Sequence, residues 1–152
     1  MRRFIRPAAP EDAARLAEIE IFNYRLYFYP IFRTDKYFFT ELTVPALVDE
    51  YSASPEKITR TLVYDDGIVK AFVRVNGDEI EKLFVEPCFH CMGIGSALLQ
   101  FAIEERGGRH LLVLEKNPRA IRLYERNGFV CTDERRMVDD TDEYFIIMRH
   151  ER

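Results

Sequence analysis

The sequence predicts one α/β domain, built on a mixed, mostly antiparallel twisted sheet of about seven strands with about four helices. Three observations lead to this prediction. Strand-like runs separated by tight-turn signals occupy the middle of the chain. A strand, a helix and another strand then follow one another over residues 79–115, which indicates a right-handed parallel crossover. The 152 residues, 47% of them hydrophobic, suit a single core, so we expect one domain over residues 1–152.

The first third of the chain predicts one short strand and two helices. Residues 2–6 alternate in polarity and are typical of a strand. Residues 10–12 place proline and two acids in a first helical turn, which suits the helix dipole. Apolar residues at helical spacing then continue to Pro30, and residues 43–52 predict a second, short helix. The segment between these helices is less regular.

The middle of the chain predicts three consecutive antiparallel strands, at residues 60–65, 68–75 and 78–85. These runs are rich in β-branched and aromatic residues. Asp-Gly at 66–67 and Asn-Gly at 76–77 separate them, and both pairs favour tight hairpins.

The last third alternates helices and strands. A helix over 96–106 ends at two glycines, an apolar strand covers 110–116, and a helix over 117–128 begins with an asparagine cap. Residues 129–135 and 142–150 complete the sheet. The expected order is therefore β-α-α-β-β-β-α-β-α-β-β.

Composition excludes several classes of protein. The net charge of −4 and the pI of about 5.5 argue against a nucleic-acid partner. No segment approaches the ~20 apolar residues of a membrane helix, and the first residues lack a secretory core. Three cysteines are too few for a disulfide scaffold. We expect a cytoplasmic protein without a membrane partner.

Residues 86–100 permit two interpretations. Cys88 and Cys91 form a C-x-x-C pair, as in a thiol redox site or half of a zinc site. A redox helix would have to include Gly93 and Gly95, which cost roughly 1 kcal/mol each, and a zinc site lacks its second ligand pair. Alternatively, the glycines expose backbone amides at the start of a helix, which is how proteins hold phosphate. A plain strand-to-helix turn is the remaining alternative.

Two linked segments favour the interpretation in which the glycines expose amides that bind phosphate. Residues 79–102 resemble the acetyl-CoA loop of the GNAT superfamily of N-acyltransferases, V-x-P-x-x-[QR]-x-x-G-x-[GA], with matches at Val85, Pro87, Gly93 and Gly95. Residues 113–130 resemble the second conserved segment of the family, with matches at Asn117, Ala120, Tyr124, Gly128 and Phe129. The resemblance is close over 59–134 and topological beyond.

The loop also departs from the family pattern. His90 stands where Gln or Arg is usual, and Cys91 and Met92 replace small and basic residues. Because the family's loop works through backbone amides, we expect phosphate binding to survive, and the C-x-x-C pair is then incidental.

The resemblance implies an acetyl-CoA-dependent N-acetyltransferase that uses no metal. Its acceptor would be a small-molecule or peptide amine, which attacks the thioester directly. The backbone edge of one strand, the amides of residues 90–96 and the start of the following helix would hold the cofactor. The implied cofactor-binding residues are Leu83, Phe84, Val85, His90, Cys91, Met92, Gly93, Ile94, Gly95, Ser96, Asn117, Ala120 and Tyr124.

The resemblance also implies catalytic roles. Tyr124 takes the position of the general acid that protonates the departing thiolate, although a core aromatic is the alternative. Glu81, then Glu79, takes the position of the proton acceptor for the amine, on a strand face that we expect to continue through Leu83 and Val85. A solvated strand face is the alternative. Glu115 is a further candidate acceptor.

Three arginines and nine aromatic residues are candidates for contacts with the cofactor or with the acceptor. Arg119, Arg122 and Arg126 share one helix face, which either meets the nucleotide phosphate or is solvated and paired with Glu125. The aromatics border the acceptor side of the family's site, where they would line an acceptor pocket, form core or make a homodimer surface. They are Phe22, Tyr24, Tyr27, Phe28, Tyr29, Phe32, Tyr37, Phe38 and Phe39. We expect at least half to be core, and Cys131 to be a small core residue.

Two other functions remain open from the sequence. A non-catalytic acyl-CoA-binding or sensing domain would have the same loop, and a thiol oxidoreductase would depend on Cys88 and Cys91 instead.

Overall fold

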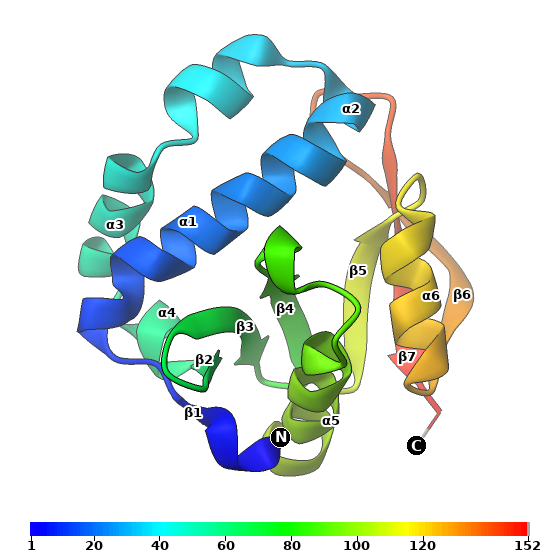
Figure 1. The fold of residues 1–152 in the computed structure, drawn as a ribbon. Helices are drawn as coiled ribbons and strands as arrows, with labels where there is room; N and C mark the ends of the chain where they lie inside the picture. Colours follow the sequence, from blue (N-terminus) through cyan, green and yellow to red (C-terminus); the bar gives the residue numbers. More distant parts are fainter. Residues whose placement is uncertain (152) are drawn as a thin grey trace.

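The computed structural model describes residues 1–151, which form a seven-stranded mixed sheet with helices on both faces (Figure 1). The strand order is β1-β2-β3-β4-β5-β7-β6, and every neighbouring pair is antiparallel except β4 and β5. The strands are β1 (Ile5–Pro7), β2 (Thr61–Asp65), β3 (Val69–Asn76), β4 (Glu79–Val85), β5 (His110–Leu114), β6 (Phe129–Met137) and β7 (Tyr144–His150). The predicted sheet is confirmed.

The four expected helices are present, together with two single turns. The α-helices are α1 (Ala13–Asn23), α2 (Tyr29–Phe32), α3 (Val44–Ala53), α4 (Glu56–Thr59), α5 (Ile94–Arg106) and α6 (Pro118–Arg126). Short 3₁₀ segments are η1 (Arg2–Phe4), η2 (Pro10–Asp12) and η5 (Pro87–Phe89), and π segments are η3 (Tyr24–Phe28) and η4 (Tyr37–Glu41). None of the helices within residues 1–151 is long and apolar enough to cross a bilayer.

Two predictions for the N-terminal region were wrong in detail. Helical backbone does not end at Pro30, because this proline lies in the first turn of α2, where its missing N–H leaves no hydrogen bond unmade. Residues 2–4 form η1 rather than strand, so that β1 begins only at Ile5.

Helices pack on both faces of the sheet, and successive side chains of β3 point to opposite faces to meet them. Ala71 and Val73 face a core shared with α5, whereas Phe72 faces a second core beneath α1 and α3. In Figure 1, α1 and α5 accordingly lie on different sides of the central strands. A third cluster joins α1 and α3 to the aromatic segment, with Phe38 at its centre and Tyr24, Phe28, Tyr29 and Phe32 packed against it. These are five of the nine aromatics, as expected.

The parallel pair diverges, and this divergence opens the site. Only Glu79 and Ile80 of β4 pair with β5, although β4 continues to Val85. On its other side β4 pairs with β3 along its length, except that the register shifts at Glu81 and leaves this residue without a partner across the strand. The second half of β4 therefore presents one open backbone edge.

Cys131 is exposed, contrary to the prediction of a core position. It lies on β6, which is the last strand of the sheet and is exposed over most of its length. Only Phe129, at the start of β6, is buried, where Tyr124 of α6 packs against it, so Cys131 further along this edge strand stays exposed.

Candidate active site

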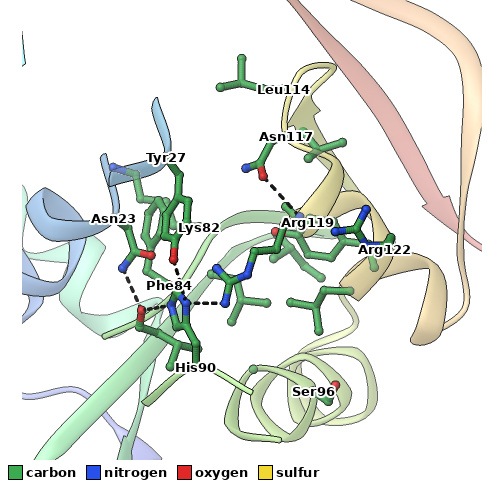
Figure 2. A pocket seen from close by; sticks show the side chains of 18 of the residues that line it. Asn23, Tyr27, Lys82, Phe84, His90, Ser96, Leu114, Asn117, Arg119 and Arg122 are labelled. Carbon is green, nitrogen blue, oxygen red and sulfur yellow. Dashed lines mark hydrogen bonds between the residues drawn. The ribbon is translucent and has the colours of Figure 1, made fainter. Parts of the chain in front are cut away.

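The main cleft, about 610 Å³ in volume, lies where β4 and β5 diverge (Figure 2). Its walls are the second half of β4, the loop before α5, the first turn of α5, the exposed side of α6 and the π segment η3. The predicted site residues meet here, with one exception. Lining the cleft are Glu79, Glu81, Leu83, Phe84, Val85, His90, Cys91, Gly93, Ile94, Gly95, Ser96, Asn117, Ala120 and Tyr124. Met92, which is 59% exposed, points away and can contribute only its backbone amide.

Six consecutive backbone amides, in the loop before α5 and in its first turn, form no hydrogen bond within residues 1–151. Within the described part of the chain, the N–H groups of residues 91–96 donate to no protein acceptor, whereas Ala97 already donates to the Gly93 carbonyl at 3.0 Å. The first amides of any helix lack an intrahelical partner, and the helix dipole favours an anion there. The prediction for residues 90–96 needs one correction, because the His90 amide donates to Pro87 in the η5 turn at 3.3 Å.

The loop backbone explains the glycine motif and weakens the thiol interpretation. Gly93 has φ 82°, a left-handed conformation that glycine adopts at no steric cost, and Cys91 adopts φ 64°, which costs a non-glycine residue roughly 1 kcal/mol or more. Because α5 begins only at Ile94, neither Cys88 nor Cys91 lies in its first turn, where a thiol redox motif would place a cysteine. Both cysteines are exposed and free.

His90, Tyr27 and Arg119 form a cluster that bridges the cleft (Figure 2). The His90 Nε2–H donates to the Val85 carbonyl at 2.7 Å. Its Nδ1 accepts from the Tyr27 hydroxyl at 3.2 Å and from the Arg119 guanidinium. The Tyr27 ring also stacks on His90 at 5.7 Å between centroids and carries the Arg119 guanidinium over its face at 5.0 Å. The cluster thus joins η3, the loop and α6.

The cluster holds His90 in its neutral form. A carbonyl can only accept and a guanidinium can only donate, so Nε2 carries the proton and Nδ1 carries none. Burial lowers the pKa of the imidazole below its ordinary value, the Val85 carbonyl opposes this shift, and the Arg119 charge lowers the pKa further. His90 is therefore an acceptor that holds Arg119 at the cleft.

The open edge of β4 is partly occupied at its end. The Val85 carbonyl accepts from His90 and also from the Asn23 Nδ2 at 2.9 Å, so both of its lone pairs are used. Asn23 is itself buried and anchored to the Ile19 carbonyl at 2.8 Å. Of the three strand residues predicted to pair with a cofactor, Leu83 faces the open edge with its backbone groups, and Val85 offers its carbonyl there only when a donor leaves. Phe84 does not, because its backbone groups point toward β3.

The arginines of α6 face the cleft rather than solvent alone. Arg119, Arg122 and Arg126 all line it, and none forms an ion pair with Glu125 among the described residues. This arrangement favours the interpretation in which the arginines meet a phosphate.

Tyr124 and Asn117 project from α6 into the same cleft. Asn117 caps the helix by accepting from the Ala120 amide at 3.3 Å, which leaves its Nδ2 available. Tyr124 packs on the α5 core and against Phe129 at 6.1 Å, and its hydroxyl has no partner in residues 1–151. Burial raises the pKa of the phenol to about 12, so the hydroxyl stays protonated and can act as an acid.

The two candidate bases differ in their surroundings. Glu81 is exposed at the register shift of β4, and Glu79 is half-buried near His110, with 3.8 Å between Glu79 Oε1 and His110 Nε2. The predicted strand face does not continue from Glu81 to Leu83 and Val85. The register shift at Glu81 interrupts the alternation of side chains, and Leu83 and Val85 pack against the core shared with α5. The third candidate, Glu115, is held outside the cleft by Arg135 at 3.1 Å.

One polar network behind the cleft has no signal in the sequence. Asn127 is buried and donates to Ser96 Oγ at 3.1 Å and to the Leu123 carbonyl at 2.8 Å, while it accepts from Gln100 at 2.8 Å. It fixes the end of α6 against the first turns of α5, and so sets the position of Tyr124 relative to the free amides. Its partners on α5, Ser96 and Gln100, lie 31 and 27 residues away in the sequence, so only the structure reveals the network.

This fold and cleft define the class of α/β domains that hold an extended anionic cofactor between a diverging strand and a helix N-terminus. The family model of the acetyltransferase (GNAT) domain matches residues 57–131. The chain is 31% identical over 86 residues to the peptidyl-lysine N-acetyltransferase YjaB of Salmonella typhimurium, a match that covers 57% of this chain and 59% of that protein.

Solved structures agree with this class in fold. YjaB of Escherichia coli superposes with a TM-score of 0.69 at 18% identity, over 97% of this chain and 96% of that one. The PaiA N-acetyltransferase of Thermoplasma acidophilum, solved with coenzyme A, gives 0.68 at 19% identity, over 96% and 98%. Over residues 57–131, about half of its length, the chain is similar to the GNAT domain, and both sequence motifs line the cleft.

Proposed function

We propose that this protein is an N-acetyltransferase that transfers the acetyl group of acetyl-CoA to a primary amine. The observation that carries the proposal is the row of six unused amides at residues 91–96, placed beside the open edge of β4. A diphosphate fits the amides, and the peptide-like pantetheine arm fits the strand edge. The two features adjoin each other in the main cleft.

The basic residues of α6 complete the cofactor site. Arg122 and Arg126 lie along the cleft near the start of α5, where they would meet phosphate oxygens. Arg119 is held by His90 and Tyr27 in the unliganded protein. It would exchange this contact for a phosphate, because an ionised acceptor binds a guanidinium more strongly than a neutral imidazole does.

The amine must lose a proton before it attacks. An alkyl ammonium with a pKa of ~10.4 is unprotonated in about one molecule in 2,500 at pH 7, a handicap of roughly 4.6 kcal/mol. Glu81 or Glu79, acting directly or through water, would take the proton. The neighbouring Lys82 does not compete for either carboxylate, because it is paired with the buried Glu20 at 2.6 Å on the α1 side of the strand.

The acetyl group then moves in a balanced step. The amine nitrogen forms a bond to the thioester carbon, the carbon–sulfur bond breaks, and the electron pair leaves on sulfur. Tyr124, kept protonated by burial, would give its proton to the thiolate. The products are an N-substituted acetamide and free coenzyme A.

An acceptor screen tests the proposal. Acetyl-CoA is incubated with the protein and a library of primary amines and a lysine-containing peptide, and free thiol is measured. We expect thiol release that depends on one class of amine, together with binding of acetyl-CoA by calorimetry. Binding without release from any amine would instead indicate a non-catalytic acyl-CoA-binding domain, and no binding at millimolar acetyl-CoA would overturn both.

A further inference from the structure

A second cavity of about 530 Å³ adjoins the main cleft, and none of residues 90–96 lines it. We call it the aromatic cavity. Tyr24, Phe28, Leu114 and Phe145 line both spaces, so the two lie side by side. A ligand whose reacting end lies beside β4 and α6 would pass these four residues to reach the aromatic cavity.

Aromatic rings form one wall of this cavity. Tyr24 stacks on Phe28 with 4.6 Å between centroids, and Phe38 meets Tyr37 edge to face at 5.1 Å and Phe32 in a stack at 6.3 Å. These contacts fix the rings without a ligand. Apolar ring surface of this kind suits a methylene chain, and ring faces attract a cation within about 6 Å.

The charges of the two spaces are opposite in sign. Asp139 and Asp140, in the turn between β6 and β7, line the aromatic cavity, and no lysine, arginine or histidine is among the residues that line it. Neither aspartate forms an ion pair with any described residue. Arg135 and Arg136, the basic residues nearest in sequence, are not among the lining residues, and Arg135 is paired with Glu115 at 3.1 Å. Lys116 is paired with Glu143 at 3.1 Å. By contrast, three arginines line the main cleft.

We propose that the acceptor is an α,ω-diamine or longer polyamine, whose second ammonium binds in the aromatic cavity between the rings and the two aspartates. This inference rests on the proposed acetyl transfer and names its substrate class. One amine reaches the main cleft and is acetylated, and the methylene chain lies along Tyr24 and Phe28. The distal amine stays protonated, and its charge is met by Asp139 and Asp140. A monoamine of the same length gains the apolar contact but leaves both carboxylates without a cation.

A comparison of paired substrates tests this inference. kcat/KM is measured by thiol release for a series of α,ω-diamines and for the monoamines of equal chain length. We expect the best diamine to exceed its monoamine by about tenfold, the effect of roughly 1.4 kcal/mol from two solvent-facing carboxylates. The preference should weaken at high salt, since exposed charges are screened.

The double substitution Asp139→Asn and Asp140→Asn should bring the diamine-to-monoamine ratio close to one. Asparagine is nearly isosteric and tolerates the left-handed backbone of Asp140, which has φ 61°. Asp142→Asn is the matched control, because it removes the same charge from the same turn at a residue outside the cavity lining, and it should keep the ratio.

Equal kcat/KM for diamines and monoamines would overturn the inference, as would a ratio that survives the double substitution or a lysine-containing peptide that exceeds every diamine. If acetyl-CoA binds but no amine releases thiol, acetyl transfer fails separately. Calorimetric titration of the diamine then decides: binding that the double substitution abolishes supports the site, and no binding overturns it.

Discussion

Replacing Tyr124 by phenylalanine is expected to lower turnover by about 100-fold, the lower end of the range for a lost general acid. The phenol lies in the main cleft with its hydroxyl unpartnered among the described residues, and burial raises its pKa to about 12. The thiolate would then have to leave without a proton donor. Binding of acetyl-CoA should stay within about twofold, because the ring and its packing on Phe129 are kept.

The pH dependence supplies an internal check on this prediction. The folded-state pKa of Tyr124 lies above its ordinary value of 10.0, so the acid remains protonated, and turnover should not fall through loss of the acid until the pH approaches 12. The same shift stabilises the fold below pH 10, and that stability is lost as the pH rises from 10 toward 12. Tyr64→Phe, a buried position outside the cleft, is the control substitution. Turnover by Tyr124→Phe above half the wild-type value would refute the role of the acid.

Replacing Gly95 by proline is expected to weaken acetyl-CoA binding by about tenfold or more. Proline removes one of the six free amides but is tolerated in the first turn of a helix. A hydrogen bond to a charged group contributes about 1.5 kcal/mol or more, which is about tenfold in affinity. Calorimetry with acetyl-CoA measures the effect.

Gly95→Ala separates the amide from the side chain. A Cβ at this residue would meet Leu123 and Val85 at 3.5 Å, which is ordinary contact, and the N–H is retained. Alanine should therefore bind acetyl-CoA more tightly than proline does, by most of the tenfold effect. Acetyl-pantetheine lacks the diphosphate, so its binding should be similar in the two variants. Equal acetyl-CoA affinity for alanine and proline would show that this amide does not bind phosphate.

Local pattern was sufficient to predict the strands, the order of elements along the chain and the loop, but not the position of β7 between β5 and β6 in the sheet. Hairpin turns, the strand–helix–strand run and the spacing of Val85, Pro87, Gly93 and Gly95 are all short-range features, and each appears in the structure where it was expected. In the proposed function the loop binds the cofactor through its backbone, which would explain why the motif remains recognisable although His90 and Cys91 depart from the usual residues.

Contacts between distant segments could not be predicted. The cluster of Tyr27, His90 and Arg119 joins residues from three elements, and Asn127 connects α6 to α5. The register shift at Glu81 depends on how β4 pairs with β3, so the alternation over 79–85 gave no sign of it. The aromatic segment was also ambiguous, since the same rings form core on one side and line the aromatic cavity on the other.

Amide nuclear magnetic resonance during titration with coenzyme A shows whether residues 91–96 bind the diphosphate through their backbone. We expect the amide protons of residues 91–96 to shift downfield and become protected from exchange, while the His90 amide, already bonded to Pro87, changes little. Saturable binding of coenzyme A that leaves the amides of residues 91–96 unshifted and exchanging freely would contradict this binding mode.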